Sequence, residues 1–141
     1  MLAAFGAERG GVENKNAVSV VAAWQEAANV GDFERLAELS DPGIELAGPR
    51  GSGHGHELLR DWLARAGLTL RTRRVFAAGD AVVAQQHGIW RSVETGAFAG
   101  EADVASCFRV ARGRVAYLSR HEDLGEALEE AGLAYEDEVS F

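Results

Sequence analysis

Four histidines are the side chains of this sequence best suited to bind a metal or accept a proton: His54, His56, His87 and His121. No two of them have the i,i+4 spacing of a helical zinc site, and the lone Cys107 offers no Cys–His cluster. The sequence therefore predicts neither a metal nor a cofactor. Neutral imidazole accepts protons near pH 7. His121 precedes two carboxylates, which makes it the candidate general base; the alternative is a surface ion pair with Arg120.

The stretch Asp80–Arg91 combines an apolar strand pattern with polar side chains. It places Gln85, Gln86 and His87 between valines and Trp90. A buried strand must satisfy such groups with hydrogen bonds inside the protein or with a ligand. Alternation along the strand puts Gln86 and Trp90 on one face and Gln85 and His87 on the other, and a shift of one residue exchanges the two faces.

The periodicity of apolar residues predicts the elements that position these side chains. A helical period gives way after Gly67 to the alternation typical of strands, with breaks that suit tight connections. In chain order we expect helices capped by Asn16 and Asp32, a short strand at Ile44–Leu46, a flexible glycine-rich loop at Gly48–Gly55, a helix from His56 to Ala66, four strands at Leu68–Ala78, Asp80–Arg91, Phe98–Ala111 and Arg114–His121, and a helix at Leu124–Ala131.

This order predicts an α+β fold with helices on one face of a mainly antiparallel sheet. Curvature of such a sheet leaves room for a small ligand between sheet and helices. The 141 residues suit one domain. Eight acidic residues in the last twenty positions account for the net charge of −8, so no basic surplus is available for nucleic acid. The sequence shows no membrane span or signal peptide, and the single cysteine favours the cytoplasm.

Three local motifs resemble the cone-shaped fold of nuclear transport factor 2-like proteins, which include ketosteroid isomerases and SnoaL-type polyketide cyclases. They are Trp24–Asp32, His54–Leu59 and Arg112–Val115, which look like a first helix with its Gly-Asp junction, the start of the third helix and the last hairpin. The resemblance covers about residues 16–132 and implies three N-terminal helices packed in a curved sheet, with a short C-terminal helix. Residues 1–15 are then a flexible arm, and residues 133–141 are an acidic tail with a mobile end.

The catalytic residues of the ketosteroid isomerases do not carry over to this sequence. The family's oxyanion-hole tyrosine falls at Trp24, its base near Ala47 or Gly48, and its second oxyanion donor near Ser106. Proton abstraction beside a carbonyl needs both a base and an oxyanion partner. For a SnoaL-type cyclase, Asp103 is in the right strand but is expected to face outward.

Aligning Trp90 with the family's pocket tryptophan turns Gln86 and Trp90 inward. The expected ligand contacts are Trp24, Gln86, Trp90, Ser106 and Phe108, with Arg50 and His54 in the glycine-rich loop. Gln85 and His87 then lie on the convex face, where relatives usually pair as homodimers. We therefore expect a domain that binds a small, largely apolar or aromatic molecule. The alternative is an isomerase, cyclase or hydratase with a histidine base.

Overall fold

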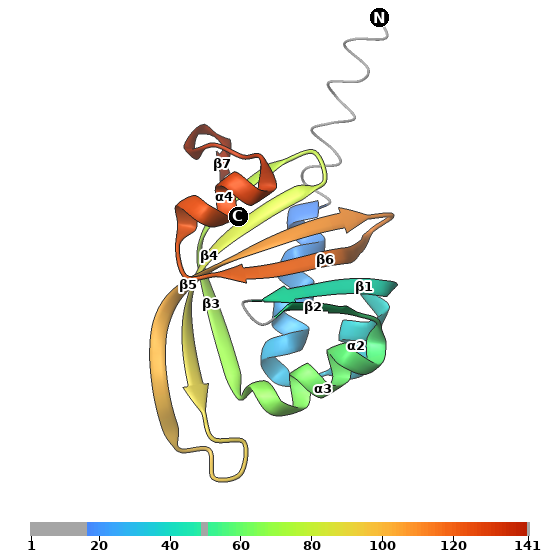
Figure 1. Cartoon of the computed structure of the whole chain (residues 1–141), viewed down its shortest axis with the longest axis vertical. Coiled ribbons are helices and arrows are strands. Elements are labelled where there is room, and N and C mark those ends of the chain that lie inside the picture. Colours follow the sequence, from blue (N-terminus) through green and yellow to red (C-terminus); the bar gives the residue numbers. More distant parts are fainter. Residues whose placement is uncertain (1–16, 49–50, 141) are drawn as a thin grey trace, which may run out of the picture.

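The computed structural model describes residues 17–48 and 51–140 (Figure 1). Its α-helices are a first helix, described over residues 17–30, and α2 (Phe33–Glu38), α3 (His56–Ala66) and α4 (Leu124–Ala131), and a short 3-10 helix follows at Tyr135–Asp137. In these ranges no helix has the length and apolar character needed to cross a membrane. The predicted arm at residues 1–15 and the candidate Arg50 lie outside the described residues.

The described strands form one mixed sheet. They are β1 (Ser40–Gly48), β2 (Gly51–His54), β3 (Leu68–Ala78), β4 (Ala81–Arg91), β5 (Phe98–Ala111), β6 (Arg114–His121) and β7 (Glu138–Val139). Their order is β2-β1-β6-β5-β4-β3-β7, in which β1 and β6 run parallel and the other neighbours run antiparallel. The α+β class and the mainly antiparallel sheet are confirmed, and β3 to β6 have the predicted bounds to within one residue.

Tight turns explain why β3 to β6 follow one another as neighbours. Ala111 pairs with Arg114 across the two-residue turn Arg112-Gly113, whose φ angles are 56° and 77°. A type I′ turn needs positive φ at both positions and matches the twist of the strands that it joins. The two turn residues alone therefore predict this hairpin, without any information on the rest of the fold.

The three N-terminal helices cover one face of the sheet, which we call the concave face (Figure 1). The first helix buries the residues of its apolar stripe: Ala17, Val20, Val21, Trp24, Ala27 and Ala28. These pack with Val82 and Ala84 of β4 and with Phe108 of β5 in one apolar cluster. The concave face is thus the main core of the domain.

The opposite, convex face is covered at one end by the chain's own C-terminal segment. Ala127 and Leu128 of α4 pack with Val83 and Cys107 of the sheet. Beyond α4, β7 pairs with β3, and Glu138 forms an ion pair with Arg74 at 2.7 Å. The predicted mobile acidic end is corrected here, because Arg74 supplies a charge partner that docks it.

The predicted loop at Gly48–Gly55 is also corrected. β1 and β2 pair from Gly48↔Gly51 to Glu45↔His54, so this stretch forms an edge hairpin of the sheet. A Cβ atom on Gly53 would collide with the side chain of Leu58 in α3. The absence of a side chain at Gly53 lets Leu58 of α3 pack directly on this strand, a role that the glycine content alone did not reveal.

Gly67 joins the end of α3 to the end of β4. Its φ of +53° is left-handed, which terminates α3, and its carbonyl oxygen accepts a hydrogen bond from the Arg91 N–H at 2.7 Å. A Cβ atom at this position would overlap the carbonyl oxygen of Arg91. Both the backbone conformation and the close approach require glycine.

We expect Gly67→Ala to destabilise the fold by about 3 kcal/mol or more, because the strain of a left-handed alanine and the overlap add. Gly31→Ala is the matched control: Gly31 also has positive φ, +74°, and a Cβ there would meet nothing within 4 Å. It should cost only about 1–2 kcal/mol. Urea unfolding gives both values, and equal losses would contradict the close packing of Gly67 on Arg91.

Candidate functional site

β4 presents Gln86 to the concave face. Gln86 is fully buried, and its Nε2 donates a hydrogen bond to Gln25 Oε1 of the first helix at 3.0 Å. The neighbouring His87 instead contacts Asp103 on the convex face. The expected orientation of Gln86 is confirmed, and the alternative that turned Gln85 and His87 inward is excluded.

The protein itself satisfies the Gln86 amide. Its Nε2 also donates to Thr72 Oγ1 at 3.3 Å, and its Oε1 accepts the hydroxyl hydrogen of Ser106 at 2.7 Å. Both amide hydrogens and the amide oxygen therefore have partners. Gln86 and Ser106 were expected as ligand contacts, and the structure places them in a hydrogen-bonded network between sheet and helix.

The network continues from Gln86 to the backbone of β3. Gln25 Nε2 donates to Asn29 Oδ1 at 3.2 Å. The Asn29 side chain then pairs with the backbone of Leu70, donating to its carbonyl oxygen and accepting from its N–H, both at 2.9 Å. This end of the network is closed, because each of these polar atoms has a partner.

The other end of the network is Arg120 of β6. This end is open, in the sense that a polar atom of Arg120 lacks a hydrogen-bond partner. Arg120 Nε donates to Ser106 Oγ at 3.4 Å, and the guanidinium lies 5.3 Å from the centre of the Trp62 ring. Its Nη2 is buried without a hydrogen-bond partner, and no carboxylate of the described residues pairs with it. Burial lowers the pKa of Arg120 to about 10, which leaves it cationic at neutral pH. The alternative of a surface ion pair with Arg120 is therefore corrected: among the described residues Arg120 forms none.

Aromatic side chains fill the interior beside Arg120. Trp24 stacks on Trp62 with ring centres 6.2 Å apart and meets Phe108 edge to face at 5.7 Å. Trp24 is fully buried, and its indole N–H donates to Ser40 Oγ at 2.8 Å. The structure thus places Trp24 and Phe108 in the core, and the single donor of Trp24 is occupied.

A groove of about 300 Å³ opens between the first helix, α3 and the β3–β4 pair. We call it the α3 groove; its lining includes Gln25, Asn29, Val30, Trp62, Leu63, Leu70, Arg91 and Val93. Val30 and Val93 are 73% and 62% exposed at its rim. Trp62 and Gln25 belong both to this groove and to the polar network, so the groove adjoins the open end of the network.

A second groove of about 310 Å³ runs along the first helix above β3 and β4. Valines from the helix and the strands line it, and it shares Gln25, Asn29 and Leu70 with the α3 groove. The two grooves therefore lie on either side of the Gln25–Asn29 edge of the first helix.

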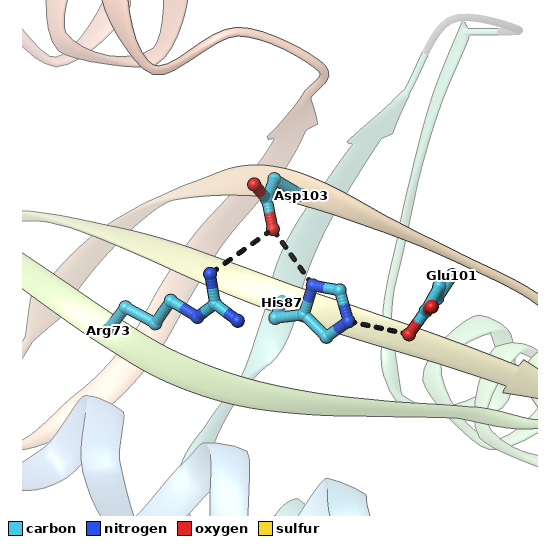
Figure 2. Close-up of polar contacts among 4 residues, drawn as sticks. All are labelled: Arg73, His87, Glu101 and Asp103. Atoms are coloured by element: carbon cyan, nitrogen blue, oxygen red, sulfur yellow. Dashed lines mark hydrogen bonds and ion pairs between the residues drawn. The ribbon is translucent and has the colours of Figure 1, made fainter.

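A charged cluster occupies the uncovered part of the convex face (Figure 2). His87 Nδ1 lies 2.9 Å from Asp103 Oδ1, His87 Nε2 lies 2.9 Å from Glu101 Oε2, and Arg73 Nη1 lies 3.8 Å from Asp103 Oδ1. Hydrogen bonds to Asp103 and then Glu101 raise the pKa of His87, and the bond to His87 lowers the pKa of Asp103. Two carboxylates on one imidazole favour the imidazolium form, which donates from both nitrogens.

His121 also lies on the convex side, beneath α4. Its Nε2 is 3.0 Å from Ser119 Oγ and 3.2 Å from Glu130 Oε2, and Glu130 also accepts a hydrogen bond from the Tyr117 hydroxyl. A catalytic serine triad needs the serine and the carboxylate on different imidazole nitrogens. Here both partners approach the same nitrogen, and neither His121 nor Ser119 lines either of the two grooves.

The remaining candidates are spread over the fold. His54 lies exposed on β2, 3.6 Å from Glu45, while Trp90 pairs with Leu68 at the start of β3. His56 Nε2 contacts the carbonyl oxygens of Ser40 and Asp41, which ties α3 to β1. Within residues 17–48 and 51–140 no group of His, Cys, Asp and Glu has an arrangement that could hold a metal ion.

Sequence reasoning missed Arg120, Gln25 and the position of Trp62 in the groove wall. The alternation of β6 held the signal for Arg120, because Leu118 faces the core and Arg120 follows it by two residues. Only the strand register, which pairs Ser106 with Arg120, shows that Arg120 meets the polar network.

Solved structures with the same fold include proteins of several described activities. A protein described as a SnoaL-like polyketide cyclase from Jannaschia sp. CCS1 has a TM-score of 0.68 at 18% identity, covering 86% of this chain and 95% of that chain. An epoxide hydrolase of the LEH-like type from M. tuberculosis scores 0.65 at 19% identity, with 84% and 91% covered. TerC, co-crystallised with polyporic acid, scores 0.67 at 20% identity, with 82% and 97% covered.

The family-model comparison assigns the chain at sequence level. None of the curated proteins searched matches it. The model of the SnoaL-like domain matches residues 21–118, which run from within the first helix to within β6. Together with the cone-shaped arrangement of sheet and helices, this match shows that the chain belongs to the SnoaL-like family of nuclear transport factor 2-like proteins.

Proposed function

We propose that this SnoaL-like domain binds a small, largely apolar or aromatic molecule in the α3 groove. The observation that supports this proposal is the shared wall of groove and network: Trp62 and Gln25 line the groove while contacting Arg120 and Gln86. A concave apolar surface with a few convergent polar groups is the usual form of a small-molecule site.

The size and the rim of the groove indicate the kind of ligand. A volume of about 300 Å³ is at the lower end of the range for small-molecule pockets. Val30 and Val93 expose apolar surface at the rim, which a ligand would remove from water at about 25 cal/mol per Å². TerC, which has the same fold, was co-crystallised with an organic acid, polyporic acid. This likeness supports a small organic ligand for the present chain.

Binding without proton transfer fits the groove better than the alternative of an isomerase, cyclase or hydratase. The lining that the structure describes holds no histidine, aspartate or glutamate. A general base must reach the proton that it removes. His121, the candidate base, lies beneath α4 beside Glu130, away from this lining.

A cytoplasmic location completes this proposal. Cys107 is the only cysteine of the sequence, and it is buried. Desolvation raises the pKa of its thiol to about 11, so the thiol is protonated and unreactive at neutral pH.

The uncovered convex face supports a second proposal, a homodimer. Arg73 and His87 lie there beside Glu101 and Asp103, so the same small surface carries both signs of charge. A two-fold axis brings a patch against its own copy, and a patch of mixed charge can then be self-complementary. Ile89, two residues from His87 on β4, supplies apolar surface on the same face.

The groove proposal predicts that the neutral fluorescent probe N-phenyl-1-naphthylamine binds the protein and that Val30→Arg weakens this binding about tenfold or more. The charged side chain would have to be desolvated at the rim for the probe to enter. Fluorescence titration measures the effect, with Ile89→Arg as the control because it lies on the other face. A wild-type protein that leaves the probe free at its solubility limit would contradict the proposal.

The dimer proposal predicts a homodimer at micromolar concentration that Ile89→Arg converts to a monomer. Two copies of the new arginine would bring like charges together close to the two-fold axis and replace the apolar contact that Ile89 supplies. Light scattering after gel filtration gives the mass, and Val30→Arg should leave it unchanged. A wild-type protein that is monomeric at micromolar concentration would refute it.

The His87 cluster should make stability depend on pH in a defined direction. The folded-state pKa of His87 is raised above 6.5, so its contribution is complete below pH 6.5 and is lost as pH rises through the raised pKa. At low pH the contribution of Asp103 is lost in turn, as pH falls through its lowered pKa. The melting-temperature difference between wild type and His87→Gln should therefore shrink from pH 6 to pH 9. His54→Gln is the control, and a difference that grows over this range would contradict the assignment.

A further inference from the structure

We propose that Arg120 is the receptor for an anionic oxygen of the ligand, so that the molecule bound in the α3 groove is a small aromatic or apolar carboxylate. This inference rests on the proposed function of that groove. It goes further by naming the ligand class and the residue that recognises it.

The hydrogen-bond network leaves one place for a ligand to complete it. From Leu70 through Asn29, Gln25 and Gln86 to Ser106, the side-chain contacts run without a gap. The Ser106 hydroxyl donates toward Gln86, which turns its lone pairs toward Arg120. Arg120 Nη2 is the buried side-chain nitrogen of the described residues that lacks a partner. The missing component is therefore an acceptor next to Arg120.

The charge of Arg120 indicates that this acceptor is an anion. A buried guanidinium without a counterion is costly, and its neutral contacts here, Ser106 and the Trp62 ring, offset only part of that cost. Arginine keeps its charge in proteins and holds carboxylates with parallel hydrogen bonds. The protein supplies no such group within the described residues, because the nearby acid Glu130 is engaged with His121 and Tyr117 on the other face.

The surroundings of Arg120 favour an anionic ligand whose remaining part is flat and apolar. Trp62 links the guanidinium to the groove, since it contacts Arg120 and also lines the groove wall. Nη2 is itself buried, so the ligand reaches it by displacing the half-buried Trp62 side chain. Rotamer changes of this kind are common when a ligand binds. An aromatic ligand can then stack on the indole while its carboxylate meets the guanidinium.

The test compares 2-naphthoate with 2-naphthamide, which have the same ring system and differ in charge. Calorimetric titration of the full chain should give an affinity for naphthoate at least about tenfold above that for naphthamide, the range of a charge-assisted hydrogen bond. Equal affinities would overturn the role of Arg120 and leave the groove proposal intact. If neither compound binds at millimolar concentration, the groove proposal fails, and this inference fails with it.

Three arginine variants assign the preference to a residue. Arg120→Met should abolish the preference for naphthoate, retain naphthamide binding and melt no lower than wild type, because it removes an uncompensated buried charge. Arg120→Lys, which keeps the charge without the planar fork, should retain part of the preference and serves if the methionine variant does not fold. Arg114→Met, on the exposed end of the same strand, is the control.

Two results would contradict this assignment. The first is a naphthoate preference that survives in Arg120→Met. The second is a preference that is lost in Arg91→Met but not in Arg120→Met, since Arg91 also lines the groove. A marked loss of stability in Arg120→Met with the preference unchanged would show that Arg120 serves the packing of Trp62 alone.

Discussion

The buried amide of Gln86 sets the arrangement of the interior. An amide without partners in such a place costs about 1–3 kcal/mol. Gln86 avoids this cost by reaching the first helix at Gln25, β3 at Thr72 and β5 at Ser106. These contacts hold the first helix over β4 and orient the Ser106 hydroxyl. The surroundings of Arg120 follow from them, because Ser106 can then offer Arg120 a lone pair but no charge.

Alternation along two strands separates the charges of the domain between its two faces. On β4, Gln86 faces the helices while His87 faces Asp103 and Glu101. On β6, Arg120 faces Trp62 while the next residue, His121, faces Glu130 of α4. His87 and His121 therefore lie beside carboxylates, whereas Arg120, which precedes His121, has no carboxylate partner among the described residues. A single step along β6 therefore separates a cation that has a carboxylate partner from one that has none among the described residues.

The same alternation explains what could be predicted from the sequence. The bounds of β3 to β6 and of α4 could be predicted, because the periodicity of apolar residues and the glycines at turns are local signals. The inward position of Gln86 followed from the resemblance at Trp90. The β1–β2 hairpin was missed because a run of glycines shows no alternation of apolar and polar side chains. The docked tail was missed because Arg74 and Glu138 are 64 positions apart in the sequence. The role of Arg120 depended on its register with Ser106, which no local pattern contains.

The proposed role of the α3 groove is to hold negative charge rather than to create it, since its described lining includes no histidine, aspartate or glutamate. Its neighbour Arg120 can stabilise an anionic oxygen, and an apolar surround strengthens that interaction. Removing a proton needs a base within hydrogen-bond reach, and the resemblance puts the isomerase base near Ala47 or Gly48, which have no basic side chain. A molecule that arrives already ionised requires only the first of these functions. These features support the proposed capture of a preformed anion over its generation.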